Sequence, residues 1–244
     1  MGRKWANIVN KKGSADQKRA LVYTKVLFEV TKAVKRGGKD PKTNFLLKVA
    51  LEKCKKNNVP KDNIEKAIKR ATGDGVEADQ DINYEGYGPN GVAIFVEAST
   101  NNVTRTAGFI KMCFSRNEGT LGNSGSLQFI FNHQAVFEVP SDGLDEDDFT
   151  LEMIDVGAEE IEHEDGHFIV HAAKEQFGAI SKKLEELDIL PDEANLEQIP
   201  ITYKEVDDET YLANMKLIHA LEEGEDVVKV YHNIEYQEHF QGLE

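Results

Sequence analysis

Three segments in the first third of the chain carry apolar residues at helical spacing. Between residues 15 and 36 an apolar residue recurs every three or four positions, which places these side chains on one face of a helix. They are Tyr23, Val26, Leu27, Val30 and Val34. Two glycines follow Lys35 and Arg36 and predict the end of this helix, because glycine readily adopts the left-handed conformation that terminates helices.

The same spacing appears twice more before residue 74. A second helix is predicted from an apolar stripe made by Leu47, Ala50, Leu51 and Cys54. Its start is capped either by the Asp40-Pro41 pair or by Asn44. A third helix begins near Pro60, ends at Gly73 and has its stripe at Ile64, Ala67, Ile68 and Ala71. Three short amphipathic helices joined by short turns predict a small bundle.

The pattern changes after the polar, glycine-containing stretch TGDGVEADQD at 72–81, which we interpret as a domain boundary. Short strands and helices then alternate. Strands are predicted at 91–99, 124–132, 134–140, 194–205 and 227–236, helices at 101–119, 145–157, 174–189 and 207–226, and a hairpin at 158–173. Hairpins in place of long crossovers favour the α+β class over a parallel α/β sheet.

Charge divides the chain at the same boundary. Residues 1–75 hold 20 Lys and Arg against 7 Asp and Glu, a formal charge of +13. The total is −15, so the remaining 169 residues carry −28. An asymmetry of this size indicates separate domains with separate partners.

Several patterns that resemble catalytic or metal sites are not supported by their context. The glycines of GTLGNSG at 119–125 follow a helix and precede a strand without a lysine, so we expect a turn and not a phosphate loop. His163, His167 and His171 are spaced by four, but Asp165-Gly166 predicts a turn between them and we expect packed or solvated histidines. No nucleophile motif is present. We therefore expect no enzyme activity, no metal and no cofactor.

The two cysteines, Cys54 and Cys113, fit neither a disulfide framework nor a metal motif. Two reduced, buried thiols are typical of a cytoplasmic protein. No apolar run approaches the roughly 20 residues of a membrane span, and the basic N-terminus lacks the apolar segment of a signal peptide. We expect a cytoplasmic protein that does not bind membranes.

A basic arm with one aromatic residue opens the chain and is the best candidate binding site. Lysine and arginine clusters attract phosphates, and an aromatic side chain among them can stack on an unpaired base. The candidate nucleic-acid-binding residues are Arg3, Lys4, Trp5, Lys11, Lys12, Lys18, Arg19 and Lys25. Trp5 either stacks on a base or packs against the bundle, and packing is the commoner fate of a large aromatic.

Four long motifs resemble the YebC family of probable transcriptional regulators, which includes mitochondrial translational activators of cytochrome c oxidase. They are KWANI, KDPKTNFLLKVALEKCKKNNVPKDNIEKAIKRA, YEGYGPNGVAIFVEASTNNVTRTAGFIKMCFSRNEGTLGNSGSLQFIF and VVKVYHNIEY. The resemblance implies a three-helix bundle followed by two ferredoxin-like α+β domains, the third inserted into the second. The implied domains are a basic nucleic-acid-binding domain (1–76), a middle domain (82–132 with 205–238) and an acidic inserted domain (134–204).

The resemblance implies a DNA-binding regulator of transcription or, alternatively, a translation factor that binds ribosomal RNA and relieves stalling at proline-rich stretches. A lysine-dominated patch contacts phosphates without selecting a sequence, so the residues alone leave both open. A third alternative is an acidic scaffold that binds a basic protein. We further expect the loops YEGYGPNG and NNVTRT to contact a partner or the ribosome, through Tyr87, Asn102 and Arg105. The sequence does not determine the oligomeric state.

Overall fold

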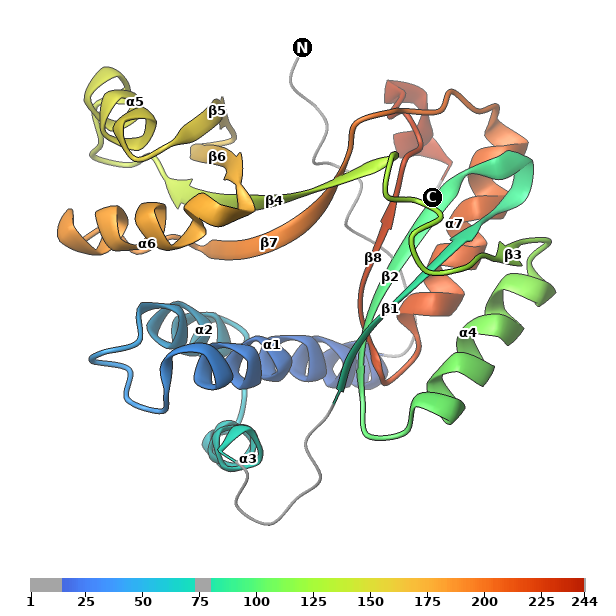
Figure 1. Ribbon diagram of the computed structural model, residues 1–244, viewed down its shortest axis with the longest axis horizontal. Helices are drawn as coiled ribbons and strands as arrows, with labels where there is room; N and C mark the ends of the chain where they lie inside the picture. The colour runs from blue at the N-terminus through green and yellow to red at the C-terminus, as the bar shows by residue number, and fades with distance from the viewer. Residues whose placement is uncertain (1–14, 73–79, 244) are drawn as a thin grey trace.

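The structure is a computed structural model that describes residues 15–72 and 80–243 (Figure 1). The chain begins with three helices, α1 (Ala15–Gly37), α2 (Phe45–Lys56) and α3 (Lys61–Ala71). Their apolar stripes meet in one core. The buried members of this core are Val26, Val30, Ala33, Val34, Leu47, Ala50, Cys54, Val59 and Ala67. The predicted bundle is therefore present.

Asn44 fixes the angle between the first two helices. Its side-chain oxygen accepts a hydrogen bond from the Leu47 amide, so Asn44 and not the Asp40-Pro41 pair caps α2. Its amide nitrogen donates to the carbonyls of Ala33 (2.9 Å) in the last turns of α1 and of Gly38 (2.7 Å), which directly follows α1. One buried side chain thus starts one helix and satisfies the carbonyls of another.

A first four-stranded sheet, sheet A, follows the bundle. Its strands are β1 (Gln80–Tyr87), β2 (Ala93–Thr100), β3 (Thr120–Leu121) and β8 (Val227–His232), in the order β3-β1-β2-β8, with antiparallel pairs throughout. Helices α4 (Val103–Arg116) and α7 (Asp208–Glu222) cover one face of this sheet (Figure 1). Alternate residues of β2, such as Ile94 and Val96, face these helices and are fully buried.

A second sheet, sheet B, is formed by the chain between β3 and α7. Its strands are β4 (Phe131–Pro140), β5 (Ala158–Glu164), β6 (His167–Ala173) and β7 (Glu193–Pro200), in the antiparallel order β5-β6-β4-β7. Helices α5 (Glu146–Asp155) and α6 (Phe177–Glu186) pack on one face around Phe137, Phe149 and Phe168. Short 3-10 turns lie at Pro89–Gly91, Lys174–Gln176 and Glu238–Gly242. The expected α+β class, with helices followed by two sheet-and-helix units, is confirmed.

Two expectations about strands were wrong. Residues 124–130 form turns, and β4 is one continuous strand that starts at Phe131. The carboxylate of Glu85 holds these turns by accepting from the Gly125 amide (2.7 Å) and the Leu127 amide (2.6 Å), a contact between residues 40 and 42 positions apart. Strand β1 was not among the predicted strands; its first residues are polar and exposed, and the strand carries the buried Glu85.

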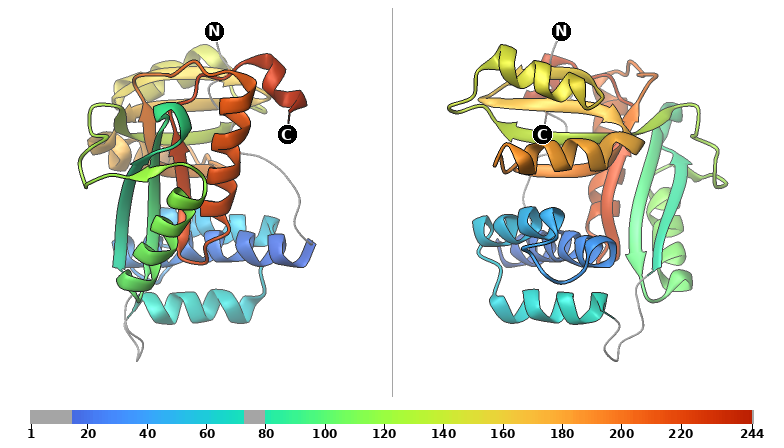
Figure 2. Two further views of the ribbon diagram at one scale, coloured as in Figure 1. Left: turned by 90° about the vertical axis from the view of Figure 1, so that its right-hand side faces the viewer. Right: turned by 60° about the vertical axis from the view of Figure 1, so that its left-hand side comes forward.

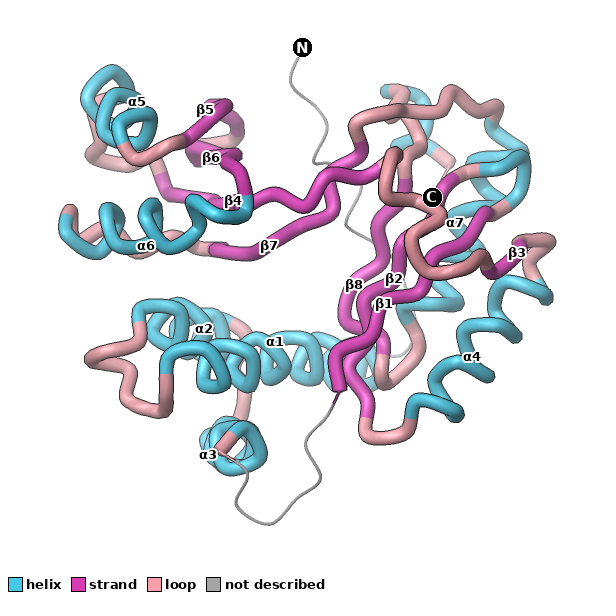
Figure 3. Tube along the Cα trace, viewed as in Figure 1, coloured by secondary structure: helices cyan, strands magenta, loops and turns pink. Residues whose placement is uncertain are grey.

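The helical bundle lies in the angle between the two sheets (Figures 1 and 2). Strands β4 and β7 extend from sheet B toward sheet A and connect the two units, as the tube in Figure 3 shows. Helix α2 lies against α6 and β7, whereas α3 packs on the opposite side of α1 (Figure 1). The two lysine-rich helices α2 and α3 therefore have different surroundings.

Among the helices within residues 15–72 and 80–243, none combines the length and the apolar composition of a membrane-spanning segment.

Candidate nucleic-acid interface

Helix α3 presents a basic face to solvent. Its apolar residues lie along one side and pack in the bundle core, which leaves the opposite arc of about 180° exposed. Four exposed cations lie on this arc, namely Lys61, Lys66, Lys69 and Arg70. Within the described residues none of the four forms an ion pair, and the arc also carries Asp62 and Glu65. This surface has a net charge of +2 and is accessible.

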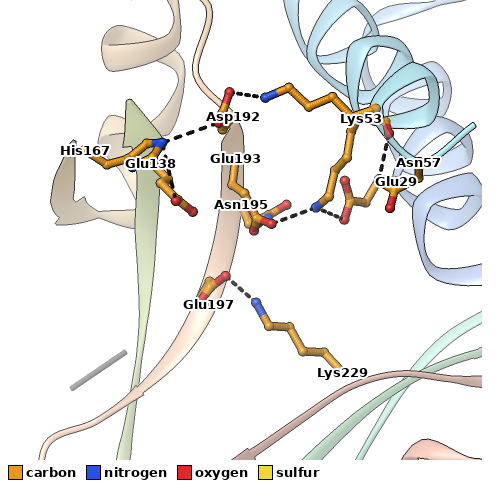
Figure 4. Close-up of polar contacts among 11 residues, drawn as sticks. Glu29, Lys53, Asn57, Glu138, His167, Asp192, Glu193, Asn195, Glu197 and Lys229 are labelled. Atoms are coloured by element: carbon orange, nitrogen blue, oxygen red, sulfur yellow. Dashed lines mark hydrogen bonds and ion pairs between the residues drawn. The ribbon is translucent and has the colours of Figure 1, made fainter. Parts of the chain in front are cut away.

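The cations of α2 are arranged differently, because two of them contact carboxylates of sheet B (Figure 4). The ammonium of Lys53 lies 2.7 Å from Glu29 of α1 and 3.0 Å from Glu193 of β7. The ammonium of Lys56 lies 2.5 Å from Asp192, which directly precedes β7. Lysines of the basic bundle are thus partners of the acidic unit.

Burial changes the proton affinities in this cluster. Burial raises the pKa of the Glu29 carboxyl above its ordinary value, although Lys53 opposes the effect. Burial lowers the pKa of the Lys53 ammonium, but Glu29 and Glu193 outweigh it and leave this pKa above its ordinary value. The pKa of Glu138 is raised by burial and by the neighbouring carboxylate of Glu193. Burial therefore disfavours the charged forms of Glu29 and Glu138, and the nearby ammonium of Lys53 stabilises these charged forms.

Other basic residues also join the units. Lys229 of β8 pairs with Glu197 of β7, whose side chain is only 3% exposed, and so connects the two sheets (Figure 4). The guanidinium of Arg36 lies 5.9 Å from the ring centre of Phe177 on α6. Part of the positive charge of the bundle therefore contacts groups of the other units of the same chain.

The structure describes only part of the predicted basic arm. Arg3, Lys4, Trp5, Lys11 and Lys12 lie outside the described residues. Lys18 and Arg19 belong to α1, with side chains outside the described part. The Lys25 side chain is partly exposed, and its ammonium lies 3.9 Å from Glu222 at the end of α7. The arm stays a prediction.

The three residues expected in partner-contact loops all have roles in the fold. Asn102 caps α4 by accepting from the Arg105 amide (3.0 Å), and the Arg105 guanidinium contacts both oxygens of Asp226 at 2.9 Å. The Tyr87 hydroxyl donates to the Ser126 carbonyl (3.4 Å). Tyr87 pairs with the first residue of β2 and Asn102 follows the last, so about 24 Å of strand separates them. The structure does not bring the two loops together.

The other candidates from the sequence do not form a reactive site. The glycine-rich segment at 119–125 contains turns, and the Glu85 carboxylate accepts from its Gly125 amide and from the Leu127 amide just beyond it. His163 and His167 lie on opposite strands of a hairpin, and His171 is buried. Among the described residues no cluster of three histidine, cysteine or acidic side chains is arranged to hold a metal ion. Cys54 and Cys113 are buried, free thiols.

The sequence predicts that the outer faces of the three helices carry most of the lysines, but the candidate site residues did not include the cations of α3. The signal was present, because Lys61, Lys66, Lys69 and Arg70 alternate with the apolar stripe at helical spacing. The candidate site residues came from the denser run of cations in the N-terminal arm. No local pattern in the sequence indicates the ion pairs of Lys53 and Lys56 with the acidic unit, because Asp192 lies 136 positions from Lys56.

A basic helical bundle attached to two sheet-and-helix units defines the class of this protein, and comparison with known proteins identifies the family. The model of the TACO1/YebC protein N-terminal domain matches residues 3–74, and that of the TACO1/YebC second and third domain matches residues 80–234. The chain belongs to the TACO1/YebC family, as the sequence motifs indicated.

Individual relatives extend over nearly the whole chain. A "probable transcriptional regulatory protein" of Persephonella marina is 42% identical and covers 95% of this chain and 94% of its own length. A protein of the same description from Amoebophilus asiaticus is 40% identical, with 95% and 96% covered. The crystal structure of a conserved hypothetical protein from Aquifex aeolicus is similar, with a TM-score of 0.79, 35% identity and coverage of 96% and 97%. The relatives' names describe probable regulators of transcription.

Proposed function

We propose that this protein is a non-enzymatic regulator of gene expression that binds nucleic acid through its helical bundle. The observation that carries the proposal is the outer face of α3, where four cations are exposed and unpaired within the described residues. Such a surface attracts a phosphate backbone by releasing its counterions. The names of the relatives support a role in transcription, with DNA as the ligand.

A second candidate is a translation factor that binds ribosomal RNA. Of the four cations on the α3 arc three are lysines, and Arg70 is the only arginine. Sequence readers of the DNA major groove use several Arg, Asn or Gln side chains along one helix face. A lysine face suits phosphates of any nucleic acid. This composition therefore suits structured RNA as well as DNA and does not favour sequence-selective DNA binding.

Charge reversal on α3 tests the proposal. We expect the variant Lys66→Glu, Lys69→Glu, Arg70→Glu to bind nucleic acid at least about tenfold more weakly at 0.1 M salt. The slope of log affinity against log salt should fall by about 2 to 3, because two or three phosphate contacts are lost. Fluorescence anisotropy of a labelled duplex DNA and of a labelled structured RNA, across a salt series, measures both quantities.

The matched control reverses three exposed lysines on other helices, Lys111→Glu, Lys182→Glu and Lys216→Glu, which changes the net charge by the same amount. We expect this control to bind within about threefold of the wild-type protein, since distant charges are screened beyond about 10 Å at 0.1 M salt. Equal losses in both variants would mean that net charge and not α3 determines binding. Sequence-dependent DNA affinity would favour the transcriptional role, and ribosome retention at physiological salt the translational one.

A further inference from the structure

The basic surface of α2 continues from solvent into the contact with β7. At 100° per residue, Lys55, Lys48, Lys56 and Lys53 lie in that order along an arc of about 160° on this helix. Lys48 and Lys55 are exposed at one end of the arc, which also carries Glu52, the partner of Lys55 at 3.4 Å. Lys53 lies at the other end, and its side chain is only 18% exposed. One basic face is therefore half open and half covered.

Carboxylates cover the second half of this face. Glu193 contacts Lys53 at 3.0 Å and Asp192 contacts Lys56 at 2.5 Å. Carboxylate and phosphate oxygens are interchangeable partners for an ammonium group, since both are anionic acceptors of its hydrogen bonds. Asp192 and Glu193 thus occupy positions that two phosphates of a nucleic acid could take.

The Lys56–Asp192 ion pair of this contact is accessible to a competing anion. The Lys56 side chain is 58% exposed and that of Asp192 is 33% exposed, so solvent and a ligand reach this pair. Exposed ion pairs are individually weak and are screened by salt. If Lys53 leaves Glu193 it keeps its second partner, Glu29, at 2.7 Å within the bundle. If α2 separates from β7, the buried Lys53 ammonium therefore still has a counterion.

We propose that α2 carries a second phosphate-binding face which β7 covers, so that Asp192 and Glu193 compete with the phosphates of a nucleic acid. The inference rests on the proposed function and adds its regulation. In the closed arrangement, nucleic acid contacts α3, while Lys53 and Lys56 are paired with carboxylates. A polyanion that displaces β7 gains Lys53 and Lys56 as further contacts.

Neutralising the two carboxylates tests this competition. We expect the isosteric variant Asp192→Asn, Glu193→Gln to bind a 30-base-pair duplex DNA or a 30-nucleotide RNA hairpin about fivefold to tenfold more tightly than the wild-type chain at 0.1 M salt. The salt slope should steepen by about 1 to 2, because up to two phosphate contacts are added. Adding Lys53→Gln and Lys56→Gln to this variant should cancel the gain.

The matched control is Asp147→Asn, Asp148→Asn, which removes two exposed carboxylates from α5. An equal gain in affinity in this control would overturn the proposal, because net charge alone would then explain it. Unchanged affinity and slope in the Asp192/Glu193 variant, with a circular dichroism spectrum like that of the wild type, would also overturn it.

The same measurements separate this inference from the proposed function. Loss of binding on α3 reversal without a gain on neutralising Asp192 and Glu193 rejects only the covered face. Absence of binding by both the wild-type chain and the neutralised variant rejects both. Binding that appears only in the neutralised variant supports the covered face and shows that β7 blocks it.

Discussion

Helices α2 and α3 belong to the same bundle and are similarly rich in lysine, but their cations have different partners. Those of α3 are exposed and unpaired within the described residues, whereas Lys53 and Lys56 of α2 contact carboxylates next to and within β7. A run of lysines therefore indicates a surface that binds anions, but it does not indicate which anion is bound. On α2 the anion belongs to the same chain.

The two helices also differ in how their first turns are fixed. The start of α2 depends on Asn44, which is buried and makes three hydrogen bonds. Helix α3 starts at Pro60, which makes no side-chain capping bond. The helix that contacts the acidic unit is therefore the one whose position is defined by specific polar contacts.

Replacing Lys53 should lower the free energy of unfolding far more than replacing Lys69. Replacing Lys53 by Ala leaves Glu29 and Glu193 without their shared cation in a partly buried site, and we expect the free energy of unfolding to fall by about 2 to 3 kcal/mol. Replacing the exposed Lys69 by Ala should change it by less than about 0.5 kcal/mol. Urea unfolding followed by far-UV circular dichroism measures the difference.

A control separates the charge of Lys53 from its packing. Lys53→Met replaces the lysine with an unbranched apolar side chain of similar size and no charge, so it should remain destabilising if the ion pairs cause the effect. A Met variant as stable as the wild type would assign the lost stability of the Ala variant to packing. Equal losses of stability on replacing Lys53 and Lys69 by Ala would contradict the difference proposed between α2 and α3.

The next effect concerns Asn44. We expect Asn44→Ala to cost about 2 kcal/mol, because the α2 cap is lost and buried carbonyls of α1 lose their donor. Pro60→Ala, at the start of α3, should cost less than about 1 kcal/mol, since it removes only the rigidity of the proline ring. The urea midpoints of the two variants provide the test, and a larger loss at Pro60 would contradict it.

The smallest effect is a difference in chemical accessibility. At limiting acetylating reagent, the Lys53 ammonium should react at least about tenfold more slowly than those of Lys66 and Lys69, because its side chain is mostly buried and its amine is held by two carboxylates. Peptide mass spectrometry after partial labelling gives the relative rates. Equal rates for the three lysines in the folded protein would show that Lys53 is not enclosed.

Local patterns in the sequence predicted much of the fold. The stripe from Tyr23 to Val34 predicted α1, and the alternation of strands and helices after residue 80 predicted the α+β class, because helical and strand periodicities depend only on neighbouring residues. Residues 124–130 were misassigned as a strand, since the carboxylate that holds them in turns belongs to Glu85 on another strand. Strand β1 was not predicted; it begins with polar, exposed residues and carries the buried Glu85, which departs from an apolar core face.

By itself, the sequence determined the three amphipathic helices, the two kinds of unit that follow and the separation of positive from negative charge along the chain. Only the tertiary structure decided which cations are exposed. Lys56 and Asp192 meet across 136 positions, and such a pairing depends on how the bundle packs between the sheets. Helical periodicity is a local property, whereas the neutralisation of a charge depends on whatever the fold brings within a few ångströms of it.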